Sequence, residues 1–461
     1  MTTTSQRLIP PVPVPARADS DVPVIVVGAG PVGLAAAAHL LSYGLTPLVM
    51  EAGERVGAAI RDWAHVRTFT PWRYLVDGAA EKLLAPTGWV RPDGDVPPTG
   101  GEVVERYLEP LAAALHPHVR TGARVVAVSR LGMDKARSSG REQAPFVVRV
   151  RDQDGEVSEI TARAVVDASG TWGHPNPLGA SGLPARGEEE TVAAGLVVSP
   201  LPDVLGRDRA RFAGRRTLVV GSGHSAANTL LDLVRLAEEV PGTEVVWAIR
   251  RSDAARGYGG GQADQLPARG QLGTDLRAAV RGRGVEQITG FSTTELRVAA
   301  DGESVDVVGA TPDGEHVIRG VDTVVAATGF RPDLGILGEV RVELDPGLES
   351  PVRLAPLIDP AFHSCGSVPP HGHRELAQPE PGLYVVGMKS YGRAPTFLVT
   401  TGNEQVRSVA AAIAGDVEAA DEVRLVLPET GVCSVDLASG ETPAVAVGSA
   451  AGLAVVGACC S

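Results

Sequence analysis

Several residue types are scarce in this chain, and each scarcity excludes a class of protein. The three lysines among 461 residues are Lys82, Lys135 and Lys389, so nearly all of the 42 basic residues are arginine. The 55 acidic residues outnumber them, and a net charge of −13 repels nucleic acid and anionic membrane surfaces. No apolar run reaches the roughly 18–20 residues that cross a bilayer. We therefore expect neither a nucleic-acid partner nor a membrane partner.

Cysteine is also scarce, and most of it lies late in the chain. The four cysteines are Cys365, Cys433, Cys459 and Cys460. They are too few to staple a chain of this length, and the N-terminus lacks the basic and apolar regions of a secretory signal. These features predict a cytoplasmic protein. Residues 1–21 are rich in proline and are predicted to form a disordered arm.

The first strong pattern is a β-branched run followed by glycines. Residues 24–27 (Val-Ile-Val-Val) predict a buried strand, and the turn Gly28-Ala29-Gly30-Pro31-Val32-Gly33 precedes an alanine-rich helix that ends near Gly44. In this G-x-G-x-x-G pattern the glycines allow a tight turn and a close approach of backbone to pyrophosphate. The helix N-terminus adds N–H groups and the positive end of its dipole.

A second strand, from Thr46 to Met50, completes this unit and ends at Glu51. A carboxylate at this place accepts hydrogen bonds from the ribose hydroxyls of an adenine dinucleotide. Strand, glycine turn, helix and acid in register predict a site for FAD.

A similar unit begins at Arg216. Its turn is Gly221-Ser222-Gly223-His224-Ser225-Ala226, and its second strand ends in Arg250-Arg251 where the first unit has an acid. Arginines there favour the 2′-phosphate of NADPH, although they are also compatible with a solvated strand end. His224 is interpreted either as an NADPH contact or as a capping or packing residue.

Two further strands run into small residues and a glycine. They end at Gly170 and at Thr328-Gly329, and they flank the second unit. We therefore predict an α/β protein with two Rossmann-like dinucleotide-binding domains, the NADPH domain being inserted into the FAD domain. Alternating runs after Ala123 and after Thr289 predict two small antiparallel sheets. The expected segments are an arm (1–21), the first FAD part (22–175), the NADPH domain (176–325), the second FAD part (326–424) and a tail (425–461).

The last strand of the fold enters another glycine turn at Gly387. A helix is predicted from about Thr401 to Ala414, and its N-terminus would lie near the flavin ring, where it stabilises the anion of reduced flavin.

Together these motifs resemble the two-dinucleotide-binding-domain flavoproteins, and among them the flavin-containing monooxygenases. The stretches that carry the resemblance are Ala168-Ser169-Gly170-Thr171-Trp172, Gly221–Ala226 with Arg250-Arg251, and Ala327-Thr328-Gly329-Phe330-Arg331-Pro332-Asp333. Residues 387–397 are similar to a subgroup associated with arsenic-resistance gene clusters. The resemblance implies FAD and NADPH as cofactors. It also implies molecular oxygen as co-substrate and transfer of oxygen from a flavin C4a-hydroperoxide to a small nucleophile with an N, S or As centre.

The chain departs from the family pattern in three places. The stretch from Gly195 to Phe212 lacks the histidine of the monooxygenase fingerprint, which argues against Baeyer–Villiger chemistry. Met388 stands where the family has an aspartate. No cysteine pair accompanies either glycine turn, which argues against a disulfide relay.

Other side chains have two interpretations each. Trp63 and Trp72 form a flavin wall or pack the core. Lys389, Tyr391 and Arg393 supply polar contacts to substrate or peroxide, or are solvated loop groups. Cys433, Cys459 and Cys460 bind a soft metalloid or are incidental thiols.

Two alternative functions therefore stay open. One is an NADPH-dependent flavin reductase or oxidase without a stable hydroperoxide, which could pass electrons to a thiol-bound metalloid. The other is a non-catalytic metalloid-binding protein.

Overall fold

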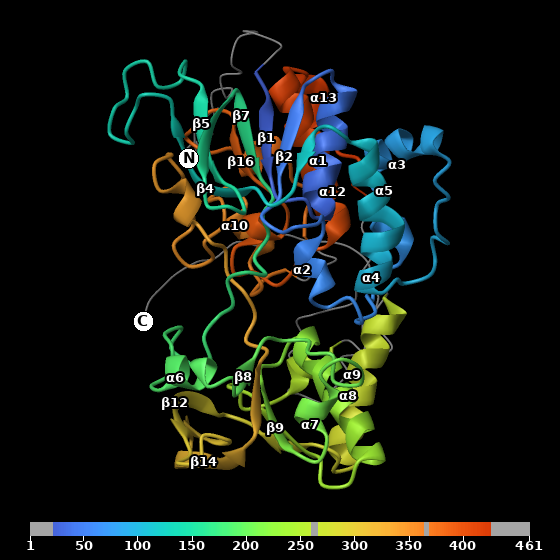
Figure 1. The fold of residues 1–461 in the computed structure, drawn as a ribbon, viewed down its shortest axis with the longest axis vertical. Helices are drawn as coiled ribbons and strands as arrows, with labels where there is room; N and C mark the ends of the chain where they lie inside the picture. Colours follow the sequence, from blue (N-terminus) through green and yellow to red (C-terminus); the bar gives the residue numbers. More distant parts are fainter. Residues whose placement is uncertain (1–21, 260–265, 364–367, 426–461) are drawn as a thin grey trace, which may run out of the picture.

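The chain folds into two lobes, which Figure 1 shows one above the other in a computed structural model. The structure describes residues 22–259, 266–363 and 368–425. The predicted N-terminal arm, almost all of the predicted tail and all four cysteines lie outside these residues. Within the described ranges, no helix is both long enough and apolar enough to span a bilayer.

The upper lobe contains a five-stranded parallel sheet. Its strands, in spatial order, are β16 (Leu383–Val385), β7 (Ala164–Asp167), β1 (Val24–Val27), β2 (Pro47–Met50) and β3 (Val119–Arg120). Alternate residues of β1 enter different cores: Val24 and Val26 pack with helices α1 (Pro31–Ser42) and α12 (Val399–Ala414). Ile25 and Val27 pack with an antiparallel sheet made of β4 (Arg124–Arg130), β5 (Phe146–Arg151) and β6 (Val157–Ala162). Both faces are covered, which is why the strand is apolar throughout.

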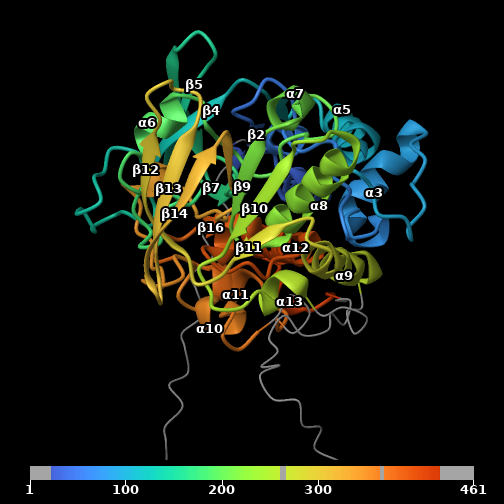
Figure 2. The same ribbon diagram turned by 90° about the horizontal axis from the view of Figure 1, so that it is seen from below.

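The lower lobe repeats this architecture. Its parallel sheet has the order β11 (Glu286–Ile288), β10 (Glu244–Ala248), β9 (Arg216–Val220), β15 (Thr323–Ala326) and β8 (Val197–Val198). Seen from below, α8 (His224–Glu239) and α9 (Pro267–Arg281) lie on one side of these strands (Figure 2). The other side carries an antiparallel sheet of β12 (Ser292–Val298), β13 (Val305–Thr311) and β14 (Gly314–Val321).

Two connecting segments join the lobes and pair with each other. Pro175 and Phe330 form an antiparallel bridge, and the rings of Trp172 and Phe330 lie 4.9 Å apart. Asn176 and Thr328 exchange two side chain to backbone hydrogen bonds, of 3.2 and 2.6 Å. The chain thus leaves the upper sheet after β7 and returns after β15, as expected for a domain inserted into another.

The remaining helices are short, and most of them cover the upper lobe. They are α2 (Ala58–Arg61), α3 (Gly78–Leu84), α4 (Gly100–Val103), α5 (Glu109–Ala114), α6 (Glu188–Ala193), α7 (Arg209–Phe212), α10 (Ala355–Ile358), α11 (His373–Leu376) and α13 (Val417–Asp421). A π-helical turn, η3 (Val104–Leu108), links α4 to α5, and the 3₁₀ turns are η1 (Trp72–Tyr74), η2 (Ala85–Thr87), η4 (Ala255–Tyr258), η6 (Gly335–Leu337) and η7 (Gly387–Tyr391). The predicted strands and long helices are present, and α8 begins at His224, inside the predicted turn Gly221–Ala226.

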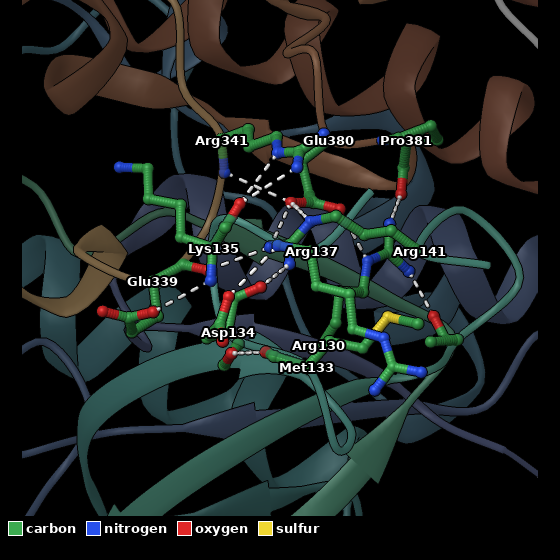
Figure 3. Close-up of polar contacts among 12 residues, drawn as sticks. Arg130, Met133, Asp134, Lys135, Arg137, Arg141, Glu339, Arg341, Glu380 and Pro381 are labelled. Carbon is green, nitrogen blue, oxygen red and sulfur yellow. Dashed lines mark hydrogen bonds and ion pairs between the residues drawn. The ribbon is translucent and has the colours of Figure 1, made fainter. Parts of the chain in front are cut away.

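A buried ion cluster lies beside the amino end of β16, an edge strand of the upper sheet. Figure 3 shows Glu380 with Arg130, Arg141 and Arg341. The Glu380 carboxylate, 1% exposed, accepts from Arg130 Nε at 2.8 Å and lies 2.7 Å from Arg141 Nη2. It also accepts from the backbone N–H of Arg341 at 3.2 Å. Burial by itself raises the pKa of Glu380, but the hydrogen bonds from the two arginines outweigh it and hold the pKa below its usual value.

Replacing Glu380 by Gln removes the charge on which both buried arginines depend. We expect the free energy of unfolding to fall by about 3–5 kcal/mol, because two buried cations lose their counter-ion. Urea unfolding of the wild type and of E380Q at neutral pH measures this difference in the free energy of unfolding. A loss under about 1 kcal/mol, the value of a surface pair, would contradict this role.

The same cluster makes stability depend on acid. Because the folded-state pKa of Glu380 is depressed, its contribution is present above the unfolded pKa of about 4.3 and disappears as pH falls through the folded value. Between these two values the wild type should lose stability more steeply than E380Q. Parallel pH curves of the unfolding free energy for the two proteins would speak against it.

Candidate functional site

The first glycine turn lies at the carboxyl end of β1, between β2 and β7. Gly28 has φ of +97°, and a Cβ there would lie 2.9 Å from the carbonyl oxygen of Ala168. A Cβ at Gly33 would lie 2.0 Å from the carbonyl oxygen of Gly28, so only glycine allows α1 to approach the strand this closely. Gly30 instead faces open space, with nothing within 4 Å of its would-be Cβ.

This turn and the helix behind it suit a pyrophosphate. Helix α1 begins with Pro31, has no acidic residue in its first turn and leaves its first N–H groups without intrahelical partners. Glu51 follows β2, and its carboxylate accepts from the backbone N–H groups of Ala29 at 2.7 Å and Gly53 at 2.8 Å. These bonds hold the carboxylate beside the turn with acceptor capacity to spare for ribose hydroxyls. The residues present therefore fit the adenine dinucleotide part of FAD.

Two other turns converge on the N-terminus of α1. Gly170, with φ of +70°, follows β7, and Gly387, with φ of +67°, follows β16. A Cβ on Gly387 would lie 3.3 Å from the side chain of Val32, and one on Gly402 of α12 would lie 2.6 Å from it. The three segments predicted to contact FAD are thus brought together at one edge of the upper sheet.

The second glycine turn has the same construction in the lower lobe. A Cβ at Gly221, with φ of +130°, would lie 2.0 Å from the carbonyl oxygen of Ala327 on the returning segment. Gly223 faces open space, and α8 has no acidic residue in its first turn. Ser222 and Ser225 are partly exposed, and His224 is exposed. The turn fits a dinucleotide phosphate as the first one does.

A tryptophan that sequence reasoning missed holds this second turn. Trp247 of β10 is 1% exposed, and its indole N–H donates to the carbonyl oxygen of Gly221 at 2.6 Å. Its ring also contacts the segment after Arg251: a Cβ on Gly257 would lie 3.0 Å from it, and the Tyr258 ring lies 6.0 Å away, edge-on. Nothing distinguishes a strand tryptophan of this kind from core packing in sequence alone.

Arg250 and Arg251 lie where the sequence placed them, just beyond the end of β10, and both are exposed. Arg250 donates one bond to the carbonyl oxygen of Ala180 at 3.0 Å, which keeps its guanidinium near the lobe surface. The backbone carbonyl of Arg251 is fixed by the N–H of Gly290 at 2.7 Å. Two exposed guanidinium groups at this strand end can receive a phosphate.

The lobes touch at the start of α8. Phe69, on the loop before η1, places its ring 5.0 Å from the ring of His224, and the guanidinium of Arg269 lies 6.0 Å from the Phe69 ring. An aromatic residue of the upper lobe therefore covers part of the second glycine turn.

Of the three residues expected at the substrate side, Lys389 and Tyr391 are buried and Arg393 is exposed. Lys389 and Tyr391 belong to η7 and are 1% and 0% exposed, so neither offers a polar atom to an open site. The Lys389 ammonium is 2.6 Å from Asp167, and the Tyr391 ring packs edge-on against Phe397. Arg393 is exposed but forms an ion pair with Glu349 at 2.9 Å. The substrate-contact interpretation of Lys389 and Tyr391 is corrected accordingly: η7 turns both side chains inward.

Trp72 and Trp63 were predicted either to form a flavin wall or to pack in the core, and they differ in how far they are buried. Trp72 is 1% exposed in the core of the upper lobe, with the guanidinium of Arg106 5.8 Å from its ring, so it cannot form a wall of an open site. Trp63 is partly exposed and packs against Gly100, whose would-be Cβ lies 2.8 Å from its ring. The cysteines predicted to hold a metalloid lie outside the described residues.

The two-lobed fold with two glycine turns agrees with comparisons to known proteins. Residues 25–352 match the profile of the family described as pyridine nucleotide-disulphide oxidoreductase. The chain belongs to this family. The match spans both glycine turns, and it confirms the predicted fold, the enzyme class and the FAD and NADPH cofactors.

Individual relatives include both reductases and monooxygenases. The ferredoxin–NADP reductase of Ignicoccus hospitalis is 27% identical over 308 residues, 67% of this chain and 77% of the reductase. The bacillithiol disulfide reductase Bdr of Bacillus cereus superposes with a TM-score of 0.64 at 20% identity, covering 86% of this chain and 99% of that one. The FAD-bound cadaverine monooxygenase DfoA of Erwinia amylovora superposes with a TM-score of 0.58 at 16% identity, covering 90% and 99%. The fold is shared by enzymes of both kinds.

Replacing Trp247 by Phe keeps the buried ring and removes the hydrogen bond to Gly221. We expect the KM for NADPH to rise about two- to tenfold, because a neutral hydrogen bond contributes about 0.5–1.5 kcal/mol, while bound FAD is unchanged. The control is F291L, which alters packing on the opposite face of the same sheet. Equal effects of the two variants on KM would argue against a role for the indole N–H.

Proposed function

We propose that the protein is an NADPH-dependent flavin monooxygenase that transfers oxygen to a small nucleophile with a nitrogen, sulfur or arsenic centre. NADPH supplies two electrons; one oxygen atom of O₂ goes to the substrate and the other leaves as water. FAD would be held at Gly28–Gly33, Glu51 and the turns at Gly170 and Gly387, and it supplies the redox chemistry when bound. The chain's own part is to hold both dinucleotides and keep water out.

The observation that carries this proposal concerns electron acceptors. Disulfide reductases pass electrons from flavin to a pair of cysteines, which requires two sulfurs beside the ring. Residues 22–259, 266–363 and 368–425 contain no cysteine, although they include both glycine turns and the turn at Gly387. Within these described residues no cysteine pair is present to accept electrons from the flavin. This supports a diffusible acceptor, and oxygen with a small substrate is the acceptor that the monooxygenase resemblance favours.

The preference for NADPH over NADH is inferred from the positive charge just beyond the end of β10. The second turn is followed by the exposed pair Arg250-Arg251, whereas the first is followed by Glu51, which suits a free ribose hydroxyl. The match to a ferredoxin–NADP reductase supports the same assignment.

A second candidate is a flavin reductase or oxidase that releases hydrogen peroxide or reduces a further acceptor. Its support is the absence of histidine from residues 195–212 and the similarity to reductases. Its chemistry differs from the first only after the flavin is reduced, so a reaction with oxygen separates the two.

Replacing Arg250 and Arg251 by Ala should raise the KM for NADPH about ten- to a hundredfold, since a hydrogen bond to a charged group contributes about 1.5–3 kcal/mol. The KM for NADH should change little. The matched control is R319A, an exposed arginine paired with Asp306 on the antiparallel sheet of the same lobe. Equal increases for both nucleotides would refute the 2′-phosphate assignment.

Rapid mixing of the NADPH-reduced holoenzyme with oxygen tests the reaction type. A monooxygenase should show a transient spectrum that belongs to neither oxidised nor reduced flavin, and its decay should become coupled to product formation when an amine, a thioether or arsenite is added. Direct return to oxidised flavin with stoichiometric peroxide would favour the oxidase. A colourless protein that takes up no flavin would overturn both.

A further inference from the structure

A buried ion pair lies beneath the turns of the FAD site. Lys389 of η7 places Nζ 2.6 Å from Asp167 Oδ2, and the two side chains are 1% and 0% exposed. The other carboxylate oxygen of Asp167 accepts from Ser169 at both its hydroxyl (2.7 Å) and its backbone N–H (3.1 Å). Lys389 Nζ also donates to the Ser169 hydroxyl at 3.0 Å. Three side chains therefore form a closed network.

This network lies at the point where the strand order of the upper sheet reverses. From β1 the chain passes to β2 on one side, while β7 and then β16 lie on the other side, and a ligand binds at the carboxyl ends of strands where the order reverses. Asp167 is the last residue of β7, and the adjoining Ala168 and Ser169 are the residues that a Cβ on Gly28 would touch. Lys389 comes from the turn after β16.

The pair thus joins two turns that are far apart in sequence. On the β7 side it holds Ser169, which is exposed at the sheet edge. On the β16 side η7 is also held from α12: Gln405 accepts from the backbone N–H of Gly387 at 2.7 Å and donates to Ser390 at 3.0 Å. The Asp167–Lys389 pair is the ionic link in this framework.

Stability alone is a weak reason for such a pair. The loss of hydration free energy on burying two charges is barely offset by their mutual attraction. A protein with well-packed apolar residues at such positions is often equally stable. The pair instead fixes the position of one turn relative to the other, because its two side chains come from different turns.

We propose that Asp167 and Lys389 are positioning residues for FAD, which set the Ala168–Gly170 turn against the Gly387 turn so that both meet the cofactor. This inference rests on the FAD site of the proposed function. It replaces the substrate-side interpretation of Lys389 with a role that acts through Ser169 and the backbone.

The test measures FAD affinity and stability separately in K389M, D167N and the double variant D167N/K389M. Each single variant leaves a buried charge and should lose stability; the double variant removes both charges and should recover most of it. The FAD dissociation constant, from the fluorescence of FAD released on dilution of the holoenzyme, should rise at least tenfold in all three. NADPH binding should not change, because Gly221 and Arg250 lie in the other lobe.

E380Q is the matched control, because Glu380 is an equally buried acid near the amino end of β16, an edge strand of the same sheet. It should lose stability and keep its FAD affinity. A double variant that regains stability and binds FAD within twofold of the wild type would overturn the inference and show a purely structural pair. If the double variant does not fold, S169A decides: it changes an exposed residue, and unchanged FAD affinity would equally overturn the inference.

These outcomes are separable from failure of the proposed function. Wild-type protein that holds no flavin would remove the FAD site itself. Wild-type protein with a full complement of flavin, together with unchanged affinity in the variants, would remove only the positioning role.

Discussion

Each lobe depends on one close contact between two backbones. In the upper lobe the turn after β1 lies against the carbonyl of Ala168, and in the lower lobe the turn after β9 lies against the carbonyl of Ala327. A side chain at Gly28 or Gly221 would collide with these carbonyls, and both glycines have positive φ. The contact brings the first turn of each lobe against the end of the strand (β7 or β15) after which the chain crosses to the other lobe. Both dinucleotide turns are thereby attached to the segments that connect the lobes.

The two lobes use charge in different ways. The upper lobe contains two buried ion-paired groups, with Glu380 between two arginines near the amino end of β16 and Asp167 with Lys389 at the carboxyl ends of the strands. The lower lobe leaves Arg250 and Arg251 exposed at the end of β10. A cofactor that stays bound is suited by a rigid site, whereas a nicotinamide that comes and goes is suited by accessible cations.

The sequence predicted the elements that depend on local pattern. β1, β2, β9 and β10 lie within a residue of their predicted bounds, and the two antiparallel sheets lie in the segments where the alternating runs predicted them, because β-branched runs bounded by glycine report strand and turn directly. Paired motifs on either side of residues 176–325 also predicted the inserted domain. Burial of single polar residues was predicted less well: Lys389 and Tyr391 were placed at an open site although η7 directs both inward. Two signals for the pairing of Lys389 with Asp167 were available in the sequence. Asp167 is an acid at the end of an apolar strand, and Lys389 is one of only three lysines.

By itself, then, the sequence determined the two dinucleotide turns, the acid after one and the arginines after the other, since these depend on residue types at short spacings. Tertiary structure alone decided which distant groups meet. Asp167 and Lys389 are 222 residues apart, and Trp247 reaches Gly221 across neighbouring strands. The physical reason is that strand order, not chain order, sets which strand ends are adjacent, and a side chain's partner is fixed only when the sheet is assembled.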